Sequence, residues 1–256
     1  MIWNPDPVAF SVFGVSIAWY GLTWSLAILL GYAVLYFIFK KEHKDLSKLV
    51  PYIQYIFIGI LLGARLFEML YYQFDYFIKD PSLFFRFREG GLSSHGAMLG
   101  SILSILLFVR KNKEFTFLWL LDRSLIAVLL QGAIIRIGNF MNSELIGKVT
   151  NAPWSVKFIQ IDSLSRHPVV LYESIWAFFC FFLFFVIYQK QKDLKPLLLT
   201  SLFLIIVLGG RVLLEFYKEA KPIFLIFSQT QLVSLVGILI GFYLLQRTYF
   251  KSSNEQ

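Results

Sequence analysis

The sequence predicts an all-α, polytopic integral membrane protein with seven transmembrane helices. Composition, long apolar runs and the placement of basic residues support this prediction. Hydrophobic residues make up 57% of the 256 residues and charged residues only 16%, and 28 phenylalanines outnumber the 24 lysines and arginines. A soluble domain cannot cover its surface with so few charged side chains. We therefore interpret the chain as a protein surrounded by a bilayer.

Seven segments approach the roughly 20 apolar residues that a membrane-spanning helix needs. The first is expected to remain as an anchor, because residues 1–16 contain no Lys or Arg and the apolar run is too long for a signal peptide. No internal repeat divides the chain, so residues 1–256 are expected to form one membrane-embedded domain. The predicted helices cover residues 17–39, 50–72, 92–109, 115–135, 169–188, 197–217 and 223–245.

The basic residues predict the orientation of these helices. The loops at residues 40–48, 110–114 and 189–196 carry four, three and three Lys or Arg residues. Short loops rich in positive charge stay on the cytoplasmic side. The sequence therefore predicts an external N-terminus and a cytoplasmic C-terminus. Because the basic residues lie in these loops and form no single basic face, the net charge of +8 does not indicate a nucleic-acid partner.

Polar residues inside the apolar runs are the candidates for function. Each charge at the centre of a membrane helix costs roughly 2.5 to 3.5 kcal/mol, so such residues should face the protein interior and find partners there. Two pairs have helical spacing and could simply neutralise each other: Arg65 with Glu68, and Arg211 with Glu215. The full set is Arg65, Glu68, His95, Asp122, Arg123, Arg136, Asn139, Glu173, Arg211 and Glu215.

The expected depth of these residues favours a binding site over scattered ion pairs. With the predicted topology, all but Asp122 and Arg123 lie toward the outer ends of their helices, as does Tyr20. Arginine can grip a phosphate with two parallel hydrogen bonds, so the outer set fits a lipid headgroup. We also expect Gly138 and Gly147 to let the backbone leave the helix and approach a ligand.

The absence of other motifs narrows the expected chemistry. The sequence has no phosphate-binding glycine loop, no Gly-x-Ser-x-Gly turn and no clustered metal ligands. Its single cysteine, Cys180, lies in an apolar run without charged neighbours, so it is expected to serve packing. A chain without its own nucleophile fits direct group transfer between two bound substrates. Neither a metal ion nor a cofactor is expected.

Six short motifs resemble those of the bacterial prolipoprotein diacylglyceryl transferases. The most specific is RIGNFMNSELIG at residues 136–147, which is similar to the family signature R-x-G-N-F-x-N-x-E-x-x-G. The others are WYG at 19–21, GAR at 63–65, GGLSSHGAMLG at 90–100, RHPVVLYE at 166–173 and GGRVLLEFYKE at 209–219. The family's seven helices and external N-terminus agree with the topology predicted above.

The resemblance implies roles for particular residues. It implies catalytic roles for Tyr20, His95, Arg136 and Arg211, and substrate binding by Arg65, Arg136, Asn139, Glu144, Gly147 and Glu215. Either His95 or Tyr20 could take the proton of the attacking thiol, and the sequence does not decide between them. The chain also departs from the family pattern. Ser143 stands where glycine is usual, Lys218 where arginine is usual, and Val169-Val170 replaces a Ser/Thr-Gln pair.

The reaction implied by the resemblance is transfer of the diacylglyceryl group of phosphatidylglycerol to the lipobox cysteine of a preprolipoprotein. A thioether forms and glycerol phosphate leaves. The implied partners are phosphatidylglycerol, preprolipoprotein signal peptides and membrane lipids, and the implied location is the bacterial cytoplasmic (inner) membrane. Two alternatives remain: an inactive homologue that still binds lipid, and a polytopic transporter, although a transporter should line a path to both faces. A retinal photoreceptor is disfavoured because residues 223–245 contain no lysine.

Overall fold

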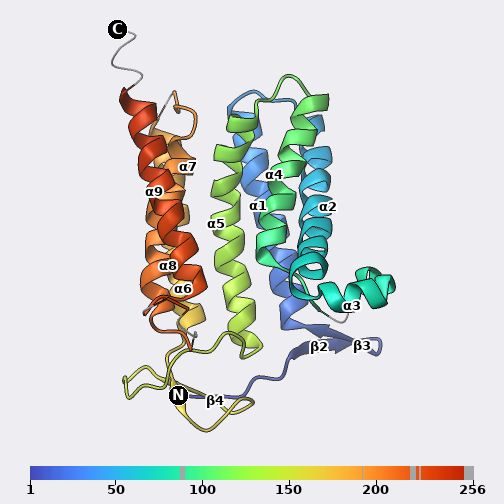
Figure 1. The fold of residues 1–256 in the computed structure, drawn as a ribbon, viewed down its shortest axis with the longest axis vertical. Coiled ribbons are helices and arrows are strands. Elements are labelled where there is room, and N and C mark those ends of the chain that lie inside the picture. The colour runs from blue at the N-terminus through green and yellow to red at the C-terminus, as the bar shows by residue number, and fades with distance from the viewer. Residues whose placement is uncertain (87–89, 192, 220–222, 225, 251–256) are drawn as a thin grey trace. The chain divides into compact units, whose positions relative to one another are not determined.

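The computed structural model describes residues 1–86, 90–191, 193–219, 223–224 and 226–250. The chain divides into two compact units, Met1–Val34 with Asp122–Gln256, and Leu35–Leu121. Both are mainly helical, as the sequence predicts, with helices at all seven expected positions (Figure 1).

The first unit contains most of the long helices. The helices described there are α1 (Trp19–Lys41, which continues into the second unit), α5 (Phe117–Met141, which begins in the second unit), α6 (Val169–Lys190), the short α7 (Leu198–Leu202) and α8 (Leu208–Glu215), and α9 (Gln229–Phe250). A π-helical turn at Phe203–Val207 joins α7 to α8. Helix α9 packs along α7, the π turn and α8 (Figure 1).

The second unit is built on the pairing of two helices, α2 (Leu49–Phe67) and α4 (Ser94–Lys111), which lie side by side in Figure 1. Glycines allow their close approach, because a Cβ at Gly63 would lie 2.3 Å from the carbonyl oxygen of Gly96. The smaller elements are a 3-10 turn at Leu46–Lys48, a π turn at Glu68–Tyr72, α3 (Phe74–Lys79) and a 3-10 turn at Pro81–Phe85.

Six helical segments in the described part of the chain are long and apolar enough to cross a membrane. They are Trp19–Lys41, Leu46–Tyr72, Phe117–Met141, Val169–Lys190, Leu198–Glu215 and Gln229–Thr248. Helix α4 occupies the remaining predicted position, but polar residues at its start and Arg110 and Lys111 at its end make it less apolar. The prediction of a polytopic membrane protein is therefore confirmed with six candidate spans.

Two small sheets were not predicted. The first unit contains a hairpin of β2 (Val8–Val12) and β3 (Val15–Ala18), and a three-stranded sheet of β1 (Ile2–Trp3), β4 (Val156–Phe158) and β5 (Ser165–Arg166). In the latter, β1 pairs in parallel with β4, and β4 pairs antiparallel with β5. The indole of Trp3 donates a 3.0 Å hydrogen bond to the carbonyl of Phe140, which ties this sheet to the end of α5.

The predicted start of the last helix was wrong by six residues. We predicted Ile223, but α9 begins at Gln229. Ser228 and Gln231 form a reciprocal cap there: the Ser228 backbone N–H donates to Oε1 of Gln231 at 2.9 Å, and the Gln231 N–H donates to Oγ of Ser228 at 3.3 Å. These bonds satisfy donors that a helix N-terminus leaves free, so the helix starts at this pair.

Candidate active site

The last turn of α5 and the segment after it position the most specific motif. Arg136 and Asn139 lie three residues apart on α5, and Asn139 is buried. The backbone then turns through two left-handed residues, Ser143 with φ 55° and Leu145 with φ 53°. This turn brings Glu144 back toward the helix, where its backbone N–H donates to the carbonyl of Asn139 at 2.9 Å. Ser143 stands where the family that the motifs resemble usually has glycine, and a left-handed backbone favours glycine.

Among the described residues of the first unit, eight polar side chains form one connected network, which we call the polar network. Its members are Glu144, Asn142, Asn139, Arg136, Glu173, Lys218, Glu215 and Ser228.

The first half of the polar network orients Arg136. Asn139 donates through Nδ2 to Oε2 of Glu144 at 2.6 Å, and its Oδ1 accepts from Nη1 of Arg136 at 3.2 Å. The Nε of Arg136 lies 2.9 Å from Oε2 of Glu173, at the start of α6. Arg136 is thus held from two sides while its side chain stays 25% exposed. The guanidinium is oriented but still open to a ligand.

The second half of the polar network is centred on Lys218. Its Nζ lies 2.5 Å from Oε1 of Glu173 and 3.5 Å from Oε2 of Glu215. Ser228 donates to the other oxygen of Glu215 at 3.1 Å. Both carboxylates are buried, so the ammonium group of Lys218 and the guanidinium of Arg136 together offset their two negative charges where water does not.

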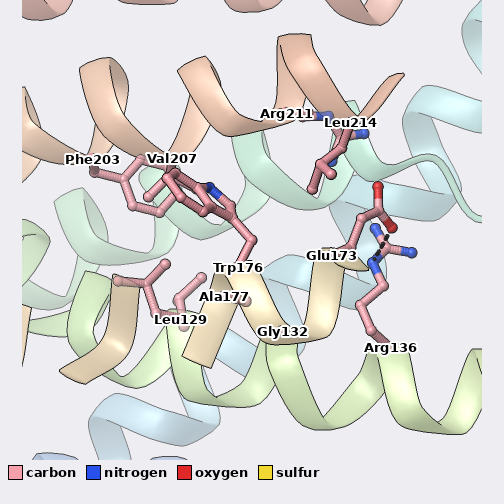
Figure 2. Close-up of a pocket in the computed structure, with 11 residues that line it drawn as sticks. Leu129, Gly132, Arg136, Glu173, Trp176, Ala177, Phe203, Val207, Arg211 and Leu214 are labelled. Atoms are coloured by element: carbon pink, nitrogen blue, oxygen red, sulfur yellow. Dashed lines mark ion pairs between the residues drawn. The ribbon is translucent and has the colours of Figure 1, made fainter. Parts of the chain in front are cut away.

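A cavity of about 180 Å³ lies beside the polar network (Figure 2). Arg136, Glu173 and Arg211 line its polar end, and these residues come from α5, α6 and α8. The other lining residues are apolar or glycine apart from one indole: Val128, Leu129, Gly132, Trp176, Ala177, Phe203, Val207 and Leu214. A cavity with two guanidinium groups at one end and an apolar body has the polarity of an anionic lipid.

Arg211 does not form the ion pair that its spacing with Glu215 allows. Glu215 is engaged by Lys218 and Ser228 instead. Within the residues described, the guanidinium of Arg211 makes neither a hydrogen bond nor an ion pair, although it lines the cavity. Self-neutralisation is therefore the wrong interpretation for this pair.

Gly147 lies beyond the end of α5 and allows close packing of neighbouring segments. It forms a β-bridge with Lys218 and its carbonyl accepts a 3.0 Å hydrogen bond from Nη1 of Arg166. A Cβ at Gly147 would lie 2.4 Å from the carbonyl oxygen of His167, so the segments fit only around glycine. Arg166 also binds Asp162 at 2.5 Å, and this hydrogen bond holds the pKa of Asp162 below its usual range.

Gly138 lies inside α5, and its φ is not positive. The backbone therefore does not leave the helix at Gly138, contrary to the prediction. A Cβ at Gly138 would lie 2.2 Å from Oγ1 of Thr23, so Gly138 lets α1 and α5 approach closely. Thr23 in turn donates to the carbonyl of Tyr20 at 3.0 Å. The half-buried Tyr20 thus lies about one turn along α1 from this contact with the helix that carries Arg136.

Arg65 and His95 belong to the second unit. The buried guanidinium of Arg65 donates to backbone carbonyls of the following loop: Leu83, Phe84 (3.1 Å), Arg86 (3.0 Å), Gly90 (2.5 Å) and Gly91 (3.0 Å). Glu68 accepts from Nε2 of Gln73 at 3.0 Å. Half-buried His95, in the first turn of α4, lies 6.1 Å from the ring of Phe67. Arg65 therefore shapes the loop that leads to the His95 motif.

Four members of the polar network were not predicted as site residues: Asn142, Glu173, Lys218 and Ser228. Glu173 was noted only as a polar residue in an apolar run, and Lys218 only as a departure from the family pattern. The sequence did contain a signal for Glu173 and Lys218, because they lie in the motifs that carry Arg166 and Arg211.

Across the described residues, no three His, Cys, Asp or Glu side chains are grouped as metal ligands.

Comparison with known proteins gives the same family as the motifs. The model of the prolipoprotein diacylglyceryl transferase family matches residues 7–247. Three similar proteins are each named phosphatidylglycerol–prolipoprotein diacylglyceryl transferase. That of Tolumonas auensis is 38% identical over 96% of both chains. Those of Bacteroides fragilis and Chloroherpeton thalassium are 35% and 34% identical, over 94% and 100% of this chain and 92% and 97% of theirs. The chain belongs to the prolipoprotein diacylglyceryl transferase family.

Proposed function

We propose that this protein transfers the diacylglyceryl group of phosphatidylglycerol to the lipobox cysteine of a preprolipoprotein. The cysteine sulfur attacks the glycerol carbon that carries the phosphate. A C–S bond forms, the C–O bond to the phosphate breaks, and glycerol phosphate leaves with the electron pair of that bond. The thiol proton passes to a base, and the product is a thioether.

The observation that carries this proposal is the pairing of Arg136 and Arg211 at the polar end of an apolar cavity. Two guanidinium groups can bind the phosphate of a lipid whose glycerol backbone enters the apolar part, while its acyl chains extend out of this cavity of about 180 Å³. They also stabilise the negative charge that grows on the phosphate as the C–O bond breaks. Arg211 suits this role especially, since it binds no other group among the described residues.

The remaining predicted site residues support these two arginines. Asn139 and Glu144 orient Arg136 through their hydrogen bonds, and Glu215 holds Lys218 beside Glu173. We propose His95 or Tyr20 as the base, on the strength of their motifs. A thiol with a pKa near 8.5 is only a few per cent ionised at neutral pH, so a base increases the attacking thiolate. Contacts of Arg65 and Gly147 with the bound headgroup also remain part of the proposal.

The proposal includes topology and location. We propose that α4 is a seventh membrane span, that the N-terminus is external and the C-terminus cytoplasmic, and that the chain works as one domain in the bacterial cytoplasmic membrane. The basic loops at residues 40–48 and 110–114 support this orientation. The lipobox cysteine of a signal peptide would then meet the site near the outer leaflet.

The test is a direct assay with purified protein, phosphatidylglycerol and a lipobox peptide, read by mass spectrometry. We expect a diacylglyceryl adduct on the peptide cysteine and release of glycerol phosphate. The matched control is the same peptide with serine in place of cysteine, which should stay unmodified. A folded protein that binds phosphatidylglycerol but yields no adduct would show an inactive lipid-binding homologue instead.

A further inference from the structure

The cavity contains one polar side chain that the proposed function does not use. Trp176 lies on α6 and lines the cavity together with Arg136 and Arg211. Its indole nitrogen is buried and, within the part of the chain that is described, has no hydrogen-bond acceptor. A buried indole N–H normally has an acceptor.

Packing fixes the position of this N–H. A Cβ at Gly210 would lie 2.0 Å from the indole nitrogen, so the nitrogen edge lies directly against α8, one residue before Arg211. The indole also stacks on Phe179 of the same helix, with ring centroids 5.4 Å apart and planes at 29°. The indole therefore lies between α6 and α8, with its unpartnered nitrogen on the α8 side, next to the backbone position of Arg211. Figure 2 shows it between the charged end of the cavity and the apolar end at Leu129 and Phe203.

The depth of Trp176 matches a particular part of a bound lipid. Trp176 follows Glu173 by three residues, which is about 4.5 Å along the helix axis. A diacylglycerol phospholipid has the same order of groups: phosphate, then two esters on the next carbons of the glycerol backbone, then acyl chains. With the phosphate on Arg136 and Arg211, the first acceptors deeper in the cavity are the ester carbonyl oxygens.

We propose that the indole N–H of Trp176 donates a hydrogen bond to an ester carbonyl of the diacylglyceryl group and so selects diacyl lipids. This inference rests on the proposed function for the identity of the lipid. Trp176 would be a substrate-binding residue that fixes the glycerol backbone relative to the two arginines. It takes no part in bond making or breaking.

An ether analogue of the substrate isolates this contact. Dialkyl-ether phosphatidylglycerol lacks both carbonyls but keeps the C–O bond to phosphate that breaks in the reaction. Its transfer therefore reports on recognition alone. We expect the wild-type protein to prefer the diacyl lipid by about fivefold in kcat/KM, the usual net effect of one hydrogen bond. Trp176→Phe, which keeps an aromatic ring but removes the N–H, should abolish the preference.

Two controls separate the contact from general effects. Trp154→Phe removes another indole, one that donates to Tyr172 at 2.7 Å and does not line the cavity, and it should keep the wild-type preference. If Trp176→Phe unfolds, benzothienylalanine at position 176 replaces the N–H by sulfur at nearly constant shape. A variant at position 176 that keeps the wild-type ester preference overturns the inference, as does a wild-type protein with no preference.

Binding distinguishes this inference from the proposed function. Native mass spectrometry with the two phosphatidylglycerols measures the ester preference without turnover. If the wild-type protein transfers neither lipid but binds the diacyl form better, and Trp176→Phe loses that difference, the proposed function fails and the role of Trp176 stands. If the protein instead transfers both lipids at equal rates and binds them equally well, the proposed function stands and the role of Trp176 fails.

Discussion

The ammonium nitrogen of Lys218 lies 2.5 Å from Oε1 of Glu173, and the two side chains are 13% and 9% exposed. This ion pair joins the segment after α8 to the start of α6. The second oxygen of Glu173 contacts Arg136. The carboxylate of Glu173 therefore links Lys218, which has a structural role, to Arg136, a proposed catalytic residue.

Replacing Lys218 by methionine should therefore destabilise the fold. The change leaves Glu173 and Glu215 buried with one fewer cation, and breaking a buried pair costs about 3 to 5 kcal/mol. The measurement is the stability of the detergent-solubilised protein, which is unfolded by heat or by denaturant. Lys218→Arg is the matched control and should stay near wild type, because it keeps the charge. Equal stability of the methionine variant would contradict the importance of this pair.

Arg136→Lys should lose most transfer activity although the charge remains. The planar guanidinium contacts Glu173 through Nε and Asn139 through Nη1 and still faces the cavity, whereas lysine has a single nitrogen. Loss of one charge-assisted hydrogen bond to phosphate predicts a decrease of about 10- to 100-fold in kcat/KM. Nearly normal turnover would mean that Arg136 acts only through long-range electrostatics.

Ser143→Gly should stabilise the protein. Ser143 is buried with φ 55°, a conformation that costs a side-chain-bearing residue roughly 1 to 2 kcal/mol. Its hydroxyl also has no hydrogen-bond partner among the residues described. Because glycine loses more entropy on folding, we expect a net gain of about 1 kcal/mol in the free energy of unfolding.

Ser143→Ala separates the two causes. It removes the buried hydroxyl but keeps the left-handed strain, so its stability should lie between those of wild type and the glycine variant. If alanine stabilises as much as glycine, the backbone conformation is not the source of the gain.

Cys180→Ala should leave transfer within a few-fold of wild type. Cys180 is fully buried in α6 and does not line the cavity, and the thiol consumed in the reaction belongs to the substrate. Activity and intact mass of the protein after turnover are the measurements. A glyceryl adduct on Cys180 would contradict direct transfer.

The sequence predicted the helices because each is a long apolar run, and periodic or continuous hydrophobicity is the strongest local signal. The strands were missed because β1 and β5 have only two residues each and depend on partners far along the chain. The start of α9 could have been predicted from the sequence, since Ser228 and Gln231 have the spacing of a capping box before an apolar run.

Prediction of the site was limited in the same way. The motifs identified Arg136, Asn139 and Glu144, whose contacts with one another are local. Sequence spacing could not show that Lys218, rather than Arg211, pairs with Glu215, because that choice depends on which side chains face the cavity between α5, α6 and α8.

Because Glu215 has an ion-pair partner among the described residues and Arg211 does not, replacing each of them by glutamine should have opposite effects on stability and on activity. Arg211→Gln breaks no ion pair within the described structure, so the free energy of unfolding should change by less than about 1 kcal/mol. Transfer should fall by at least about 10-fold, because the proposed contact of Arg211 with the phosphate is lost. Glu215→Gln should instead destabilise the fold, since it removes a buried partner of Lys218.

The double exchange, Arg211→Glu with Glu215→Arg, completes the comparison. It places a guanidinium beside Lys218, at a position where the native carboxylate lies 3.5 Å from Nζ, and a carboxylate at the phosphate end of the cavity. Like charges at this separation repel, so the exchange should recover neither stability nor turnover. Unfolding curves and the peptide assay are measured on all three variants. An exchanged protein with wild-type turnover would show that Arg211 belongs to the scaffold and that the phosphate binds elsewhere.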